Sequence, residues 1–261
     1  MLVLTGSNQK ILKEAMVRFP GRRGSRSQKD FELHPLSFRD VVQLKDGDLF
    51  KRITEKGIEQ KSAFQALEKH FLDYLVHGGF MVAINEFVET CSISASTLQT
   101  YSDWIRGDIL RANKSELYLR EIISGVIKRY GSQVSWQALA KDLSINHHQT
   151  VSDYIHVLSS SGVVSVLHAL QMHTLQAAPK KAKKIYFTDP FIYHALAHWL
   201  DNIDDPYQDQ ILPTLEDSVR CSALVESAVI NNYSMQEQVY YIKAEGEVDL
   251  AYIKGNSIQL R

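Results

Sequence analysis

Apolar residues recur at three- and four-residue intervals over most of residues 62–130, which is the spacing of one helix face. One such stripe is formed by Phe64, Leu67, Phe71, Leu72 and Leu75. The pair Gly78-Gly79 follows it and predicts the end of that helix. Two more helices are expected, one that begins near Ser96 and one that ends near Gly131. We therefore predict a helical bundle here.

The pattern changes between Val134 and Phe187. Ser135 is a candidate N-cap for a short helix, and the turn Ser144-Ile145-Asn146 separates it from a second helix that ends near Gly162. Two strand-like apolar runs follow, over residues 163–167 and 185–187. Helix, short turn, helix and two-stranded ribbon is the order of a winged helix-turn-helix.

Both ends of the chain predict smaller elements. Near the start, residues 2–4 and 31–33 favour short strands, residues 19–30 form a basic loop, and Ser37 caps a helix through Leu44. Beyond the junction Asp189-Pro190, the expected elements are a helix over 191–200, an acidic loop over 201–213, a helix over 215–233 and three closing strands within 239–260.

We predict an α+β fold that is mostly helical, with a winged helix-turn-helix and a small C-terminal α/β region. The patterns divide the chain into four segments. These are an N-terminal segment (1–61), a helical bundle (62–130), the winged helix-turn-helix (131–189) and the α/β tail (190–261).

Composition excludes several classes of protein. The 261 residues include 29 Lys and Arg against 30 Asp and Glu, a net charge of −1, which disfavours a generic polycationic nucleic-acid binder. The charge is unevenly spread, however: +5 over 1–61, +1 over 62–200 and −7 over 201–261. No apolar run is long enough to span a bilayer and no signal peptide begins the chain, so we expect a cytoplasmic protein. Cys91 and Cys221 are expected to be small core residues without a disulfide.

The predicted helix-turn-helix supplies candidate nucleic-acid contacts. Polar residues that can hydrogen bond to bases or phosphates begin its second helix: His148, Gln149, Thr150 and Ser152. A lysine cluster lies at the expected wing, where phosphate contact is natural: Lys180, Lys181, Lys183 and Lys184. Asp153 opposes phosphate, and winged helices also serve as protein-interaction modules, so both uses stay open.

A resemblance covers nearly the whole chain. It is carried by the order of TGSN, a GR-containing loop, HPLSF, LDYLVHGGF, YSDWIRGDILR, the helix-turn-helix, KIYFTDPFIYHAL, ALVESAV and EVD. In this order the chain resembles archaeal and bacterial ATPases of the AAA type that carry a C-terminal domain of unknown function. The match begins at that family's sensor strand, so residues 1–61 look like a remnant of the ATPase core.

The resemblance implies that Ser7 or Asn8 is the polar sensor that faces the γ-phosphate, and that Arg22 is the family's GR arginine. The family binds ATP and Mg²⁺, but this sequence lacks the G-x-x-x-x-G-K-[ST] loop that cradles the phosphates. We therefore expect no ATPase activity and no cofactor for this chain alone.

The family's tail resembles a restriction-endonuclease-like fold, in which a helix Glu, a strand Asp and an E-x-K strand bind Mg²⁺ and position water. Glu226 and Asp249 match the first two positions. The E-x-K position reads Gln259-Leu260-Arg261, and neither Gln259 nor Arg261 supplies the expected chemistry. A degenerate fold is therefore favoured over an active nuclease.

Two other groupings are given structural interpretations. His194 and His198 lie four residues apart on a predicted helix but lack a third metal ligand, so we interpret them as a half-buried or surface pair. The acidic residues after position 200 lack the spacing of a calcium loop and are expected to be solvated: Asp201, Asp204, Asp205 and Asp209.

Three functions follow as hypotheses. The first is a partial member of the AAA-type family that binds DNA or a partner protein through its winged helix. The second is a metal-dependent endonuclease-like enzyme that uses Glu226 and Asp249. The third is a protein-interaction remnant or homo-oligomer, formed through apolar surface left by a missing core.

Overall fold

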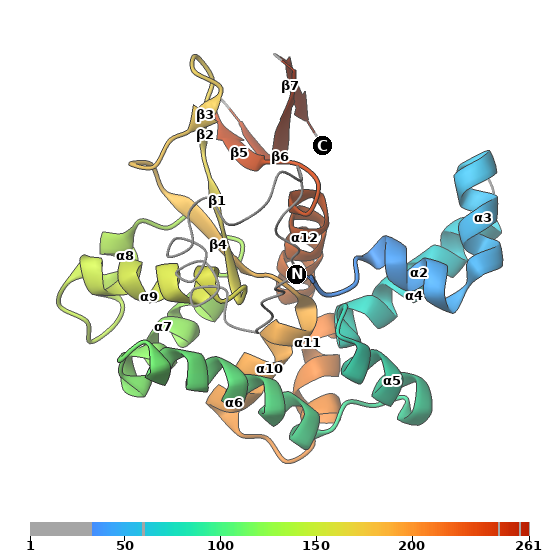
Figure 1. Ribbon diagram of the computed structural model, residues 1–261, viewed down its shortest axis with the longest axis horizontal. Coiled ribbons are helices and arrows are strands. Elements are labelled where there is room, and N and C mark those ends of the chain that lie inside the picture. Colours follow the sequence, from blue (N-terminus) through green and yellow to red (C-terminus); the bar gives the residue numbers. More distant parts are fainter. Residues whose placement is uncertain (1–32, 59–60, 245, 256, 261) are drawn as a thin grey trace, which may run out of the picture.

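The computed structural model describes residues 33–58, 61–244, 246–255 and 257–260. It is an α+β structure, mostly helical with small antiparallel sheets, as the sequence predicted at that level (Figure 1). The candidate ATP-facing residues Ser7, Asn8 and Arg22 lie outside the described residues, as does the predicted strand over 2–4.

The first half of the described chain is helical. Its elements are α2 (Phe38–Lys45), α3 (Gly47–Lys56), α4 (Lys61–His77), α5 (Met81–Thr90), α6 (Ala95–Arg111) and α7 (Glu116–Lys128). The predicted cap at Ser37 is confirmed, because its hydroxyl accepts from the Asp40 amide and the Asp40 carboxylate accepts from the Ser37 amide. Sequence patterns missed α3 and α5, but the predicted start of a helix near Ser96 is confirmed, because α6 begins at Ala95 after its cap, Ser94.

Gly78 and Gly79 end α4, as predicted, and they also allow a close approach of three segments. Gly78 has a positive φ of 58°, and a Cβ atom there would lie 1.7 Å from Asp189 Oδ1. A Cβ atom on Gly79 would lie 2.0 Å from the carbonyl oxygen of Leu36. Only glycine fits both positions, because any side chain would collide with backbone or with a buried carboxylate.

The Asp189 side chain packs against this turn and accepts a hydrogen bond from it. Its carboxylate accepts from the Gly79 amide at 2.8 Å and from the Phe191 amide at 2.8 Å, so it caps α10 (Pro190–Asp201). Pro190 occupies the first turn of α10, where a missing N–H costs nothing. One buried carboxylate therefore fixes the α4–α5 turn against the start of α10.

The segment that the sequence predicts to be a helix-turn-helix follows α7. It comprises α8 (Trp136–Lys141), capped by Ser135 as predicted, and α9 (His148–Ser160). Strand β1 (Val164–His168) pairs antiparallel with β4 (Lys183–Phe187), and Val134 bridges Lys183. Between β1 and β4 lies a small hairpin of β2 (Leu170–Gln171) and β3 (Gln176–Ala177).

The C-terminal part combines helices with one sheet. After α10 come a π-helical turn, η1 (Tyr207–Ile211), and then α11 (Leu212–Glu216) and α12 (Ser218–Ser234). The prediction of an unstructured acidic loop over 201–213 is therefore wrong for its second half. The three closing strands are confirmed as β5 (Val239–Lys243), β6 (Glu247–Lys254) and β7 (Ser257–Leu260), in the order β5-β6-β7.

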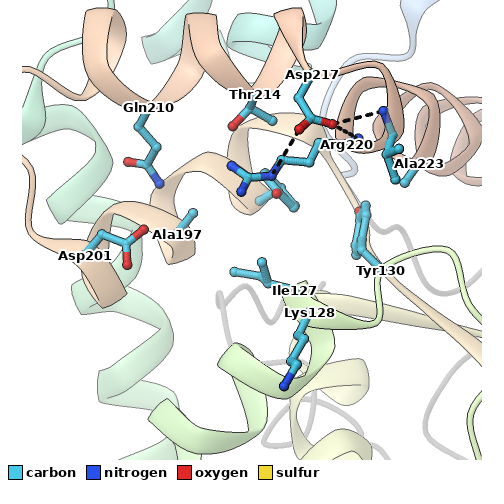
Figure 2. Close-up of a pocket in the computed structure, with 12 residues that line it drawn as sticks. Ile127, Lys128, Tyr130, Ala197, Asp201, Gln210, Thr214, Asp217, Arg220 and Ala223 are labelled. Atoms are coloured by element: carbon cyan, nitrogen blue, oxygen red, sulfur yellow. Dashed lines mark hydrogen bonds and ion pairs between the residues drawn. The ribbon is translucent and has the colours of Figure 1, made fainter.

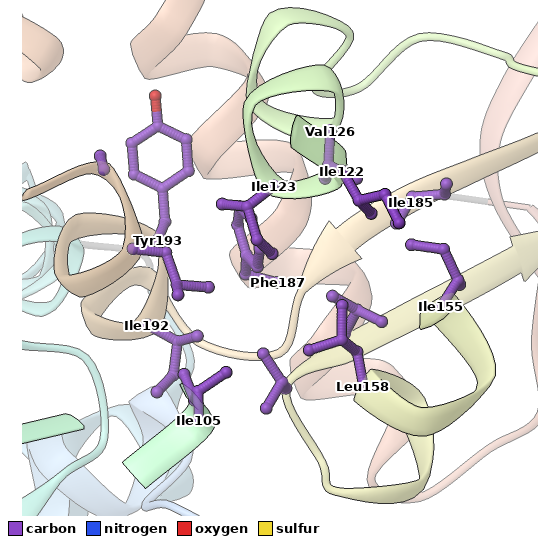
Figure 3. Packing of buried hydrophobic residues seen from close by; sticks show 14 of the residues in the cluster. Ile105, Ile122, Ile123, Val126, Ile155, Leu158, Ile185, Phe187, Ile192 and Tyr193 are labelled. Atoms are coloured by element: carbon purple, nitrogen blue, oxygen red, sulfur yellow. The ribbon is translucent and has the colours of Figure 1, made fainter. Parts of the chain in front are cut away.

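The main hydrophobic core joins these parts. It takes in Tyr74 of α4, Ile123 of α7, Ile155 of α9, Phe187 of β4 and Leu224 of α12. Figure 3 shows part of this cluster between α7, α9, α10 and β4. The segments predicted on either side of residues 130 and 189 thus share one hydrophobic core.

Several predicted environments are wrong. His194 and His198 are buried on α10, and His194 Nε2 donates to the carbonyl oxygen of Leu75 at 2.9 Å. Cys91 is exposed in a left-handed conformation at the end of α5, and Cys221 is only half-buried on α12.

No helix in the described part of the chain is both long and apolar enough to cross a bilayer.

Burial gives Asp189 and two histidines opposite pH responses. Burial raises the pKa of Asp189 to about 7, although the hydrogen bonds from Gly79 and Phe191 act to lower it. Burial lowers the pKa of His77 and of His194 to about 4. The two histidines therefore lower the free energy of unfolding of the protein as pH falls below 6.5. Asp189 lowers it in the opposite direction, as pH rises from about 4 to above 7.

The variant Asp189→Asn isolates the carboxylate, because asparagine can still cap α10 but does not titrate. We expect the wild-type free energy of unfolding, relative to the variant, to fall by roughly 2–3 kcal/mol between about pH 5 and pH 8. Denaturant unfolding of both proteins at both pH values measures this difference. The contributions of the histidines cancel because the wild type and the variant share them. A difference that is independent of pH would contradict the assignment.

Candidate functional site

The exposed face of α9 is polar. Its opposite face packs into the core through Val151, Tyr154, Ile155 and Leu158. Tyr154 also ties α9 to the start of α7, because its hydroxyl accepts from the Ser115 amide at 2.7 Å and donates to the Ser115 carbonyl at 3.0 Å. This anchoring fixes which residues of α9 face solvent.

The four predicted contact residues of α9 lie at its N-terminal end. His148 and Gln149 are exposed, and Thr150 and Ser152 are half-buried. The Gln149 amide donates to Asp153 Oδ1 at 3.0 Å, and Lys114 lies 4.0 Å from the other Asp153 oxygen. Among the described residues, no side chain caps α9, whose N-cap residue is His147. The Thr150 amide donates to the His147 carbonyl oxygen at 3.0 Å, and this end of the helix is the one that favours anions.

The lysine cluster divides into two kinds of residue. Lys180 and Lys181 are exposed in the loop before β4. Lys183 and Lys184 are buried in β4, so their prediction as surface phosphate contacts is wrong. Lys183 Nζ donates to the carbonyl oxygens of Pro179 and Lys181, and it lies 4.8 Å from the centre of the Trp136 ring. Burial lowers the pKa of Lys183.

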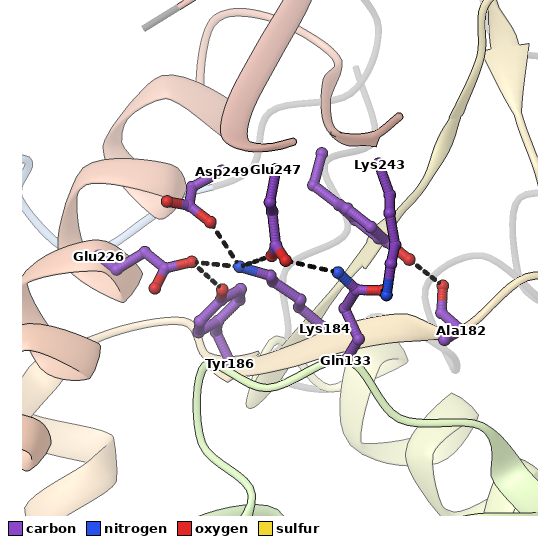
Figure 4. Close-up of polar contacts among 9 residues, drawn as sticks. Gln133, Ala182, Lys184, Tyr186, Glu226, Lys243, Glu247 and Asp249 are labelled. Carbon is purple, nitrogen blue, oxygen red and sulfur yellow. Dashed lines mark hydrogen bonds and ion pairs between the residues drawn. The ribbon is translucent and has the colours of Figure 1, made fainter. Parts of the chain in front are cut away.

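Lys184 lies at the centre of three carboxylates (Figure 4). Its ammonium is 2.9 Å from Glu226 Oε1, 2.8 Å from Glu247 Oε1 and 2.7 Å from Asp249 Oδ1. The Tyr186 hydroxyl donates to the same Glu226 oxygen at 2.5 Å. We call Lys184, Tyr186, Glu226, Glu247 and Asp249 the Lys184 cluster.

Burial and ion pairing act in opposite directions on the ammonium of Lys184, a residue that is 2% exposed. Burial alone would lower its pKa, but hydrogen bonds to Asp249, Glu226 and Glu247 outweigh burial and raise the pKa above its usual value. Burial and the hydrogen bond to Glu226 also raise the pKa of Tyr186. Lys184 is therefore charged and Tyr186 neutral at physiological pH.

The cluster extends to the start of α8 through Gln133, which precedes that helix. The Gln133 amide donates to Glu247 Oε2 at 2.7 Å and accepts from Lys243 Nζ at 3.1 Å. The Tyr241 hydroxyl donates to the Ala182 carbonyl at 2.6 Å, beside the exposed lysines. The C-terminal sheet thus supports both the entrance to α8 and the base of the β1–β4 ribbon.

The candidate nuclease residues are only partly assembled. Glu226 and Asp249 converge, as expected, and a register shift between β5 and β6 occurs beside Asp249. Gln259 is paired with Tyr252 rather than with Asp249, and Arg261 lies outside the described residues. Among the residues described, no group of three or more His, Cys, Asp or Glu side chains is arranged to hold a metal.

A divalent cation at these carboxylates would have to displace the Lys184 ammonium, which already contacts all three. Sequence reasoning missed Glu247, Tyr186 and the burial of Lys184. One signal was present: in strand β4 the alternation of side chains places Lys184 and Tyr186 on one face, where both reach Glu226. The partners themselves come from 40 or more residues away, and no local pattern identifies them.

Removal of the Lys184 ammonium should be costly. In Lys184→Met three adjacent carboxylates lose their cation, and we expect a loss of about 2–4 kcal/mol in the free energy of unfolding, since the carboxylates are partly exposed. Adding Glu226→Gln should recover part of this loss by reducing the repulsion. Equal stability of Lys184→Met and of the exposed control Lys180→Met would contradict a structural role for the cluster.

Comparison with known proteins gives one match. The model of a family described as a domain of unknown function (DUF8612) matches residues 68–203, from α4 through α10. No curated protein and no solved structure matches the chain. The matched region includes α9, Lys184 and Asp189, but not Glu226, Glu247 or Asp249. Because it spans more than half of the 261 residues, the chain belongs to this family, the domain of unknown function DUF8612.

Proposed function

We propose that residues 116–187 form a winged helix-turn-helix that binds duplex nucleic acid, with α9 as the recognition helix. The order α7, α8, α9, β1 and β4, with Val134 bridged to β4, supports this arrangement. The observation that carries the proposal is the polar, uncapped N-terminal end of α9, held rigidly by Tyr154.

The β1–β4 ribbon would supply the second contact. Its tip is partly covered, because Ala169 bridges Tyr241 and Leu170 packs with Tyr240 and Ile242 of the C-terminal sheet. Lys180 and Lys181 stay exposed beside this covered region. We infer a phosphate contact through these two lysines and base or backbone contact through His148 and Gln149.

The electrostatics favour modest affinity. The proposed surface has two exposed lysines at the ribbon and no Lys or Arg on α9 itself, whereas Asp153 opposes phosphate. Few counterions would be released on binding, so the salt dependence should be shallow. Specificity would then depend on α9 more than on net charge.

The nuclease hypothesis has weaker support, because Lys184 already uses the carboxylates that it needs. Membership of the AAA-type family stays a hypothesis, because the residues that carry its ATP-facing roles lie outside the described part of the chain. The same surface could instead bind a protein partner, and the following experiments distinguish that use from binding of duplex nucleic acid.

The ribbon lysines are tested by the salt dependence of duplex binding. Fluorescence anisotropy with a mixed-sequence duplex should show Lys180→Ala/Lys181→Ala binding more weakly, with a slope of log K against log salt that is smaller by about 2. The charge-matched control Lys51→Ala/Lys56→Ala, on exposed positions of α3, should match the wild type. Absence of wild-type binding at low salt would overturn the proposal.

The recognition helix is tested by sequence discrimination. The wild type is first used to select tightly bound duplexes from a random pool. We expect His148→Ala/Gln149→Ala to reduce the ratio of affinities between selected and random duplexes by about tenfold, with the slope of log K against log salt nearly unchanged. Ser159→Ala, on an exposed position at the far end of α9, is the control. An unchanged ratio in the double variant would exclude α9 as the reading element.

A further inference from the structure

A cavity of about 450 Å³ lies between the end of α7, the outer part of α10, the η1–α11 turn and the start of α12 (Figure 2). Its volume is typical of small-molecule sites. Buried residues form its wall, among them Tyr193, Ala197, Gln210 and Thr214. Charged residues lie at its exposed margin: Lys128, Asp201, Asp217 and Arg220.

Gln210 is the unusual residue of this wall. Its side chain is buried, with 7% of the residue exposed, yet neither its Oε1 nor its Nε2 atom has a hydrogen-bond partner among the described residues. A buried amide without partners is costly, and such groups are rare in folded proteins. Figure 2 shows Gln210 facing the hollow, with Asp201 on the same side and Arg220 across from it, so a bound molecule could satisfy both atoms.

The backbone holds Gln210 in this position by a local departure from the α-helix. The Leu212 amide donates to the Tyr207 carbonyl, five residues back, which makes η1 a π-helical turn. Pro213 follows directly, and its ring would clash with a carbonyl four residues earlier in a regular α-helix. The wider turn is thus built into the sequence, and such turns are frequent at functional sites.

The margin supplies complementary charges. In the described part of the chain, Arg220 makes a long ion-pair contact with Asp217, 4.0 Å between Nε and Oδ2. The other Asp217 oxygen, Oδ1, accepts from the Val219 and Arg220 amides at the start of α12. The Arg220 guanidinium can therefore receive an anion, and Asp201 can accept from hydroxyl groups, whereas the Lys128 ammonium points away from the hollow (Figure 2).

We propose that this cavity binds a nucleoside monophosphate. An amide offers a donor and an acceptor side by side, which matches the edge of a nucleobase. Gln210 would take the base, the Asp201 carboxylate would accept from the ribose hydroxyls, and the Arg220 guanidinium would pair with the phosphate. This proposal uses none of the residues assigned to duplex binding, so each can fail without the other.

Isothermal titration of the full chain with AMP, GMP, CMP and UMP tests the proposal, with inorganic phosphate as the reference ligand. We expect at least one nucleotide to bind with a Kd below about 1 mM and phosphate to bind at least tenfold more weakly. No detectable binding of all four nucleotides, or phosphate binding as tightly as the nucleotides, would overturn the proposal.

The variant Gln210→Leu separates binding from folding. It removes a buried amide without partners, so its thermal unfolding midpoint should equal or exceed that of the wild type, while nucleotide affinity should fall by about tenfold or more. Arg220→Ala, at an exposed position, should weaken nucleotide binding severalfold. The controls are Gln208→Leu, exposed on the same turn, and Arg39→Ala, exposed on α2. Wild-type affinity in Gln210→Leu would contradict the assignment.

Discussion

A charged ammonium inside a protein must be paired, and Lys184 meets this requirement with carboxylates from two distant elements. Glu226 comes from α12, whereas Glu247 and Asp249 come from β6. Because Lys184 itself belongs to β4, this single charge fixes the β1–β4 ribbon against the C-terminal helix and sheet. Gln133 carries the same network to the entrance of α8. The orientation of the proposed recognition surface depends on this arrangement.

The cluster also determines what the C-terminal region can do. In the sequence, Glu226 and Asp249 match part of a metal-site pattern. In the structure, the Lys184 ammonium lies between these carboxylates and neutralises part of their charge. The region then acts as a support. The residues for which we propose ligands lie elsewhere, at the N-terminal end of α9 and in the cavity wall around Gln210.

Local physical chemistry made part of this structure predictable. Ser37 and Ser135 cap helices because a hydroxyl satisfies free amides, and Gly78 ends α4 because it adopts a positive φ. Those effects act within a few residues. The order of α8, α9, β1 and β4 followed from apolar periodicity in the same way.

The errors arise where the environment of a residue depends on distant segments. Lys184 was assigned to a surface patch because four lysines within five residues suggest a solvated loop, while its carboxylate partners lie 42 to 65 residues further along the chain. His194 is buried because α4 packs over α10, and Gln210 faces a cavity because of a π-helical turn that no periodicity indicates. Only the burial that folding creates separates Lys184 from the exposed Lys180 and Lys181.

The most direct test of duplex binding through α9 is amide chemical-shift mapping of the full chain with a short DNA duplex. We expect shifts in the first turn of α9 and at Lys180 and Lys181, with the amides of Glu226, Glu247 and Asp249 unchanged. Shifts centred on those three carboxylate residues, with α9 unaffected, would show that the duplex binds the C-terminal region instead.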